Sequence, residues 1–129
     1  MGISVGDIVL AARLAWTVYS ACQAAPHEFE ALSQEVEALY IVLESIKTVV
    51  SNAGLDATKI NDLNRVAQGS ISVLTELEAL MEKYKSLGTG TRTRTWDRLR
   101  WGQQEIALLR GRLISNVSLL SAFNSNLAK

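Results

Sequence analysis

The chain has 129 residues, of which 48% are hydrophobic, and its 13 basic and 13 acidic side chains give a formal net charge of zero. This length suits one domain with an ordinary core, and the composition excludes a disordered chain. A neutral chain has no overall field that would select a highly charged partner. Cys22 is the single cysteine, so an intrachain disulfide is excluded and a reducing compartment is indicated.

The first predicted helix covers about residues 5–22 and is apolar on nearly all sides. Its start carries Asp7 and no Lys or Arg, which argues against a signal peptide. Eighteen helical residues span about 27 Å, short of a hydrocarbon core of about 30 Å, and Arg13 and Thr17 interrupt the run. We therefore expect a helix buried inside a bundle rather than a permanent membrane span. The alternative is a helix that is buried in one state and exposed to a membrane or a partner in another.

The second and third predicted helices, at about residues 27–53 and 57–87, each carry one apolar seam with alternating steps of three and four residues. Asp56 is expected to cap the third helix, as Ser4 is expected to cap the first. The second seam reads Phe29, Leu32, Val36, Leu39, Leu43, Ile46, Val50 and Ala53. The third reads Ile60, Leu63, Ala67, Ile71 (or Ser70), Leu74, Leu77, Met81 and Tyr84.

The fourth predicted helix covers about residues 95–127 and follows a polar loop at 88–95. Its leucine and isoleucine repeat falls every seven residues, at Leu99, Ile106, Leu113, Leu120 and Leu127, with Leu109, Val117 and Phe123 beside it. No segment alternates with a period of two, so we expect no strands. One-sided seams must pack against one another, which predicts an all-α, up-down bundle of four helices in a single domain over residues 1–129.

Charges are segregated along the chain even though they cancel. Residues 26–82 hold ten acidic and three basic side chains, and residues 83–129 hold nine basic and two acidic ones. The two halves could pair within the bundle or between copies. Four arginines next to two tryptophans form a basic patch that suits anionic lipid head groups. The patch comprises Arg92, Arg94, Trp96, Arg98, Arg100 and Trp101.

The residue types that enzymes and cofactor proteins need are sparse. His27 is the only histidine and has no second metal ligand nearby in the sequence, and the Gly88–Gly90 stretch lacks the strand that precedes a phosphate-binding loop. The acidic half would repel nucleic acid, and no recognition motif is present. We therefore expect no enzyme, no cofactor, no metal, no nucleic acid and no small-molecule substrate.

Several short motifs, in their order and spacing, resemble a known family. They are Ser4-Val5-Gly6-Asp7-Ile8, Leu14-Ala15-Trp16 with Tyr19 and Cys22, Ala25-Pro26 with Phe29, and Leu32-Ser33-Gln34-Glu35-Val36-Glu37-Ala38-Leu39; then Lys83-Tyr84-Lys85-Ser86-Leu87-Gly88, Arg98-Leu99-Arg100-Trp101, Ile106, Leu109-Arg110 and Arg112-Leu113. Together they resemble the N-terminal helical domain of fungal STAND (NLR-like) proteins, in the HeLo and HeLo-like neighbourhood, over nearly the whole chain.

The resemblance implies a cytosolic helical domain that precedes a nucleotide-binding switch and a repeat sensor in a larger protein. It also implies an effector role in programmed cell death or an immunity-like response, in which the N-terminal helix reaches the membrane after oligomerisation. Carried over to this chain, the membrane or partner residues are Ile8, Leu10, Leu14, Trp16 and Val18. Arg13 departs from a cleanly apolar inserting helix.

Two functional hypotheses follow from the sequence. The first is an effector that targets the plasma membrane on activation through the first helix and the basic patch. The second is a module without membrane activity, which self-associates or docks on another helical domain through complementary charged faces. Both place a non-catalytic domain in the cytoplasm.

Overall fold

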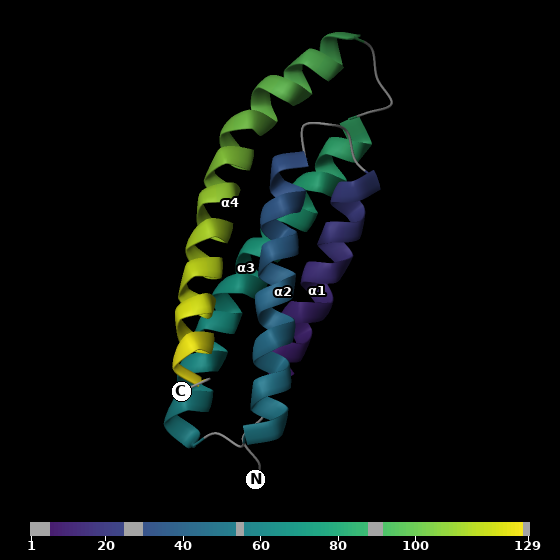
Figure 1. The fold of residues 1–129 in the computed structure, drawn as a ribbon. Coiled ribbons are helices and arrows are strands. Elements are labelled where there is room, and N and C mark those ends of the chain that lie inside the picture. The colour runs from purple at the N-terminus through teal and green to yellow at the C-terminus, as the bar shows by residue number, and fades with distance from the viewer. Residues whose placement is uncertain (1–5, 25–29, 54–55, 88–91, 128–129) are drawn as a thin grey trace.

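The computed structural model describes residues 6–24, 30–53, 56–87 and 92–127; the side chains at 24, 51–53, 84–103 and 127 lie outside this description. The described residues form an all-α bundle, as expected, in which the chain direction alternates from one helix to the next (Figure 1). The helices are α1 (Gly6–Ala24), α2 (Glu30–Ala53), α3 (Ala57–Leu87) and α4 (Arg92–Leu127).

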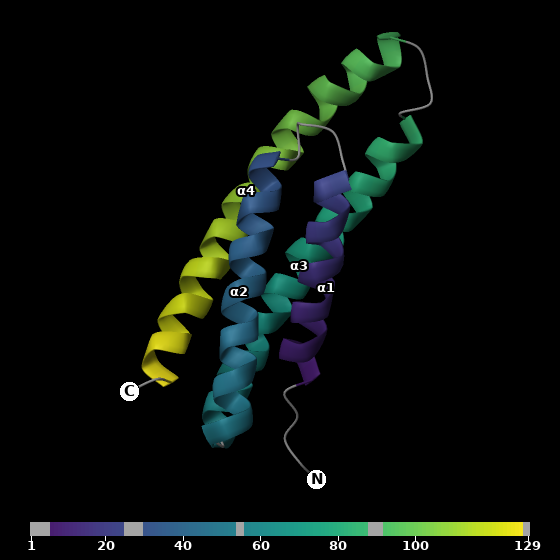
Figure 2. The same ribbon diagram turned by 45° about the vertical axis from the view of Figure 1, so that its right-hand side comes forward.

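Each helix packs chiefly against two others. Both α1 and α4 pack against α2 and α3, so α1 and α4 lie at opposite corners of the bundle. Figures 1 and 2 show this separation, with α1 and α4 on opposite sides in both views. The connection between α2 and α3 consequently joins two helices that are consecutive in the chain but diagonal in the bundle.

The bounds of α3 agree with the expected ones, α1 ends two residues later than expected at Ala24, and the expected start of α2 at 27 lies outside the described residues. The start of α4 differs from the expected one. This helix begins at Arg92, so residues 92–95 are helical and not part of a loop. After Gly90 the sequence has no proline and no further glycine until Gly102, and Arg and Thr are both tolerated in helices, so nothing prevents the earlier start. The expected cap of α3 is confirmed: Asp56 Oδ1 accepts a hydrogen bond of 2.8 Å from the backbone N–H of Lys59. The expected cap at Ser4 lies outside the described residues.

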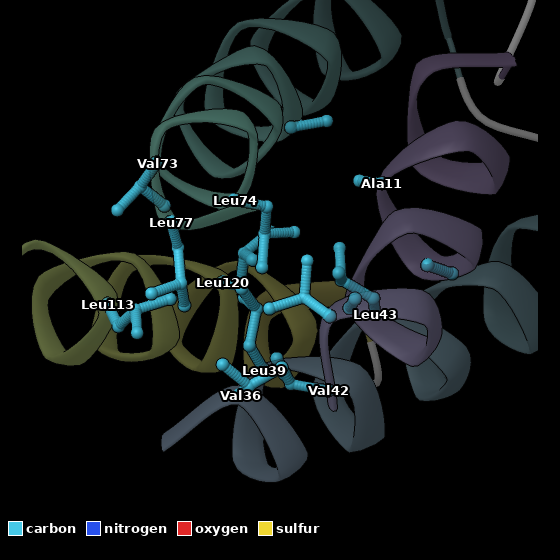
Figure 3. Close-up of a cluster of buried hydrophobic side chains, with 14 of the residues drawn as sticks. Ala11, Val36, Leu39, Val42, Leu43, Val73, Leu74, Leu77, Leu113 and Leu120 are labelled. Carbon is cyan, nitrogen blue, oxygen red and sulfur yellow. The ribbon is translucent and has the colours of Figure 1, made fainter. Parts of the chain in front are cut away.

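The predicted seams form the core. Figure 3 shows leucines from α2, α3 and α4 converging between the helices, with Ala11 on the α1 side. Burying one such leucine contributes roughly 1.5–3 kcal/mol. The predicted seam residues that are buried are Leu32, Val36, Leu39, Leu43, Ile46, Val50, Ile60, Leu63, Ala67, Ser70, Leu74, Leu77, Leu109, Leu113 and Leu120. Those whose side chains lie outside the described residues are Phe29, Ala53, Tyr84, Leu99 and Leu127.

Helix α1 is a corner helix and not one enclosed on all sides. Its inner face buries Ile8 and Val18 completely or nearly so, whereas Arg13 and Thr17 are exposed on the outer face. The physical reason is that a corner helix has two neighbours, which cover only part of its circumference. The expected burial of this helix inside the bundle is therefore confirmed for its inner face, and its outer face is exposed.

The bundle is uneven in length. At 31 and 36 residues, α3 and α4 are about 46 and 54 Å long, whereas α1 and α2, at 19 and 24 residues, reach only about 28 and 36 Å. In Figures 1 and 2 the end of α3 and the start of α4 extend beyond the tops of α1 and α2. The start of α4 thus projects from the body of the bundle.

Candidate functional site: the outer helix surfaces

The five α1 residues expected to meet a membrane or partner do not form one surface. Ile8 and Val18 lie in the core, and Leu14 is partly buried against it. Leu10 and Trp16 are about half exposed, at 50% and 52%. All five could contact one partner only if α1 left the bundle.

Trp16 belongs to an aromatic cluster that joins α1 to α2. Its ring centroid lies 5.8 Å from that of Tyr19 and 5.2 Å from that of Tyr40. Tyr40 donates a hydrogen bond of 2.9 Å to Glu44 Oε1. Hydrogen bonding to a carboxylate raises the pKa of both phenols, through Glu37 for Tyr19 and through Glu44 for Tyr40. These contacts hold the exposed tryptophan against the bundle surface.

The predicted basic patch begins α4. The backbone of Arg92, Arg94, Trp96, Arg98, Arg100 and Trp101 is helical and lies in the projecting part of the bundle (Figure 1). Their side chains lie outside the described residues. The patch therefore stays a prediction, with its position on the projecting helix end now known.

Further along α4, two arginines pair with acidic residues of the same bundle. Arg110 approaches Glu35 of α2, with 3.7 Å between Nη2 and Oε1. Arg112 forms an ion pair with Glu76 of α3. These contacts show pairing of the acidic and basic halves within the bundle. Both pairs are substantially exposed, so each contributes about 0–1 kcal/mol.

The outer face of α4 is the surface that the sequence analysis missed. Leu108, Ile114 and Leu119 are 70%, 43% and 58% exposed, which is half of the exposed large hydrophobic side chains among the described residues. In that part of the chain, the helical stretch 104–126 is the one with the length and composition to cross a membrane, and 17% of its most apolar 18-residue window is buried. The doublets Leu108-Leu109 and Leu119-Leu120 could have indicated this face in the sequence. Neighbouring residues on a helix point in directions about 100° apart, so one leucine of each doublet must lie off the seam.

The inner side of α4 is fixed by polar as well as apolar contacts. Ser70 of α3 donates a hydrogen bond of 3.2 Å to Asn116 Oδ1, and Asn116 donates one of 2.9 Å to the Arg112 carbonyl oxygen. Asn124 donates one of 2.9 Å to the hydroxyl of Ser45 on α2. Because these bonds and the ion pairs tie α4 to both neighbours, its outer face has a defined orientation.

The described residues do not assemble a metal centre. Among the side chains that the structure describes, no three of His, Cys, Asp or Glu lie close enough to hold an ion. Cys22 is buried beside Met81, with 3.7 Å between the sulfur atoms, and burial raises the pKa of its thiol to about 11. A thiol held in its neutral form is a poor nucleophile. His27 lies outside the described residues.

No family model, curated protein or solved structure matches this chain.

Proposed function

We propose that this chain is a non-catalytic helical effector or signalling domain that acts by oligomerisation through its helix surfaces. The observation that supports it is the apolar outer face of α4, with Leu108 70% exposed on a helix anchored by Leu113 and Leu120 in the core. Exposed apolar side chains on a folded domain can mark sites of association. The resemblance to the N-terminal domains of fungal NLR-like proteins supports the same role.

Light scattering coupled to size-exclusion chromatography tests this proposal over a dilution series. We expect the mass to rise above the 14.1 kDa of one chain as the concentration increases. An association driven mainly by apolar contact should survive high salt, whereas one driven by exposed charges should weaken as the Debye length shortens. A single-chain mass at every concentration and salt level would refute oligomerisation of the isolated domain.

Membrane targeting through α1 is the second candidate function. Two α1 side chains, Leu10 and Trp16, are already exposed, and the helix sits at a corner with two neighbours. Its release would uncover Ile8 and Val18 and create a larger apolar face. The basic patch on the projecting start of α4 would then attract anionic lipid.

Trp16 fluorescence tests this candidate directly. In a variant with Trp96→Phe and Trp101→Phe, Trp16 is the remaining tryptophan of the three in the chain. We expect brominated anionic vesicles to quench it, and Leu10→Glu to weaken that quenching without altering the circular dichroism spectrum. Unchanged Trp16 emission with anionic vesicles, for monomer and oligomer alike, would remove this candidate and leave oligomerisation standing.

A further inference from the structure

We propose that the outer face of α4 docks against the same face of a second copy of this chain, with the two α4 helices antiparallel. This inference rests on the proposed function and names its partner and its surface. The face runs along residues 104–126, with Leu108 and Leu119 along one edge and Ile114 along the other, about 120° round the helix axis from Leu108.

Small exposed side chains run between these large ones along the helix. They are Ala107, Gly111, Ser115, Ser118 and Ala122, all of them exposed. Their spacing of four, four, three and four residues keeps them on one side of the helix. Small residues at such spacing let two helix backbones approach closely, while flanking leucines pack across the contact.

Gly111 is the residue that the single bundle does not explain. A Cβ atom added at this position would meet nothing within 4 Å. Glycine inside a helix is less favourable than alanine, so an isolated bundle would be more stable with alanine here. Close approach of a second helix backbone supplies a reason for glycine at this position.

The stripe has nearly the same pattern when read from either end. Ala107 is followed four residues later by Gly111, and Ala122 is preceded four residues earlier by Ser118. An antiparallel pair places Ala107 opposite Ala122 and Gly111 opposite Ser118, with the two-fold axis near Ser115. This matches the requirement of a two-fold interface, in which one patch must complement itself.

The charge layout of α4 favours the antiparallel arrangement. Residues 92–112 carry six arginines and two acidic side chains, whereas residues 113–127 carry no charge. A parallel pair would align the two basic halves and repel. An antiparallel pair centred near Ser115 sets residues 102–112, with Arg110 and Arg112, beside residues 117–127 of its partner, which carry no charge.

A second copy fits this face better than a lipid bilayer does. Arg110 and Arg112 lie within the apolar stretch and are held near Glu35 and Glu76 of the same bundle. Inserting the helix would carry arginine into hydrocarbon, at a cost of several kcal/mol. It would also remove Leu113 from the core, where it is fully buried. Docking on another helix requires neither change.

The size of the face predicts a weak dimer. A stretch of 23 residues is about 35 Å long and about 10 Å wide, which gives a footprint of roughly 350 Å². This is below the about 800 Å² per partner of a standard stable interface. The dimer should therefore form and dissociate within an ordinary range of concentrations.

Three single variants test the proposal by sedimentation velocity. Leu108→Glu puts a charge into the interface, and Gly111→Leu fills the path of the partner backbone without disturbing the bundle. Ile41→Glu is the matched control, since Ile41 is a 60% exposed apolar side chain on α2. We expect each α4 variant to raise the dissociation constant at least tenfold and the control to leave it unchanged, with circular dichroism spectra alike.

Cysteine cross-linking tests the orientation in a Cys22→Ala background. Ser115→Cys lies near the proposed two-fold axis and should form a disulfide-linked dimer, whereas Gln104→Cys, on the same face but far from the axis, should not. Efficient cross-linking at both positions would overturn the antiparallel arrangement.

The remaining outcomes separate this inference from the proposed function. Dimers that persist in both α4 variants would overturn the α4 interface and leave oligomerisation standing. A wild-type monomer throughout would overturn both. If the chain is monomeric and the α4 variants lose binding to vesicles of anionic lipid, the face is a lipid surface and the inference is wrong.

Discussion

Ser70 on α3 and Asn116 on α4 form a hydrogen bond across the bundle, with 3.2 Å between the hydroxyl oxygen and Oδ1. Ser70 is fully buried, so its hydroxyl cannot exchange this partner for bulk water. An unpaired buried polar group costs about 1–3 kcal/mol, so the bond penalises any slip of α4 along α3. The orientation of the outer face of α4 depends on this register.

A double-mutant cycle on this pair should reveal the coupling. We expect Ser70→Ala to lower the free energy of unfolding by about 1 kcal/mol, because Asn116 loses its donor. Urea denaturation of Ser70→Ala, Asn116→Ala and the double variant should give a coupling energy of about 0.5–1.5 kcal/mol. Additive effects within error would show that the bond does not fix the register.

The two glycines near this contact should respond differently to alanine. At Gly111 an added Cβ meets open space, so Gly111→Ala should raise the unfolding free energy of the monomer by about 1 kcal/mol. At Gly69 an added Cβ would lie 3.1 Å from Asn116 Oδ1, which must shift to make room. We expect Gly69→Ala to gain less than Gly111→Ala, measured by denaturation at protein concentrations where the chain is monomeric. Equal gains at both positions would contradict the tight packing assigned to Gly69.

Cys22 should make stability depend on alkaline pH. Burial raises the pKa of its thiol to about 11, whereas an unfolded cysteine titrates near 8.5. A raised folded pKa contributes stability that is complete below the unfolded pKa and is lost as the pH rises toward the folded one. Wild type should lose more unfolding free energy than Cys22→Ala between about pH 8 and pH 10. In native protein a thiol reagent should react with Cys22 only slowly, and rapid labelling at pH 8 would show that the thiol is accessible.

Exchanging the two charges of the ion pair between Arg112 and Glu76 should preserve the stability of the bundle. Glu76→Arg places like charges together and should lower the unfolding free energy by up to about 1 kcal/mol, a small effect because both side chains are about half exposed. Adding Arg112→Glu restores opposite charges and should recover most of the loss. Both effects should shrink in high salt. Failure of the double variant to recover stability at low salt would mean that another interaction of Arg112 dominates.

The fold was predictable because each seam places an apolar residue on the same side of its helix many times in succession, and each of these residues must be buried. The α2 seam carries an apolar residue at every third or fourth position from Leu32 to Val50, and all of these are buried. The sequence left open whether Ile71 or Ser70 occupies the seam of α3. The structure shows that Ser70 is fully buried and Ile71 only partly. The buried serine is accommodated because Oδ1 of Asn116, far away in the sequence, accepts a hydrogen bond from its hydroxyl.

The candidate surfaces were less predictable for a geometric reason. A helix that is apolar on all sides does not reveal which residues face its neighbours, so Ile8 and Leu10 looked alike in the sequence although one is buried and the other exposed. The face of α4 was missed because its seam is flanked by leucines that read as extra core. Which apolar residues stay exposed depends on which two helices each helix packs against, and this is known only from the structure.

Intermolecular distances between spin labels test the central claim, self-association through α4, most directly. A nitroxide on Ser115→Cys, in a Cys22→Ala background, should give one short intermolecular distance, below about 20 Å, because the two labels meet near the two-fold axis. A label on Gln104→Cys lies on the same face but about ten residues from the axis, so the two copies should be about 32 Å apart along the helix. We expect both distances in concentrated samples of the two labelled variants. No intermolecular signal from either label, or a short distance from both, would contradict it.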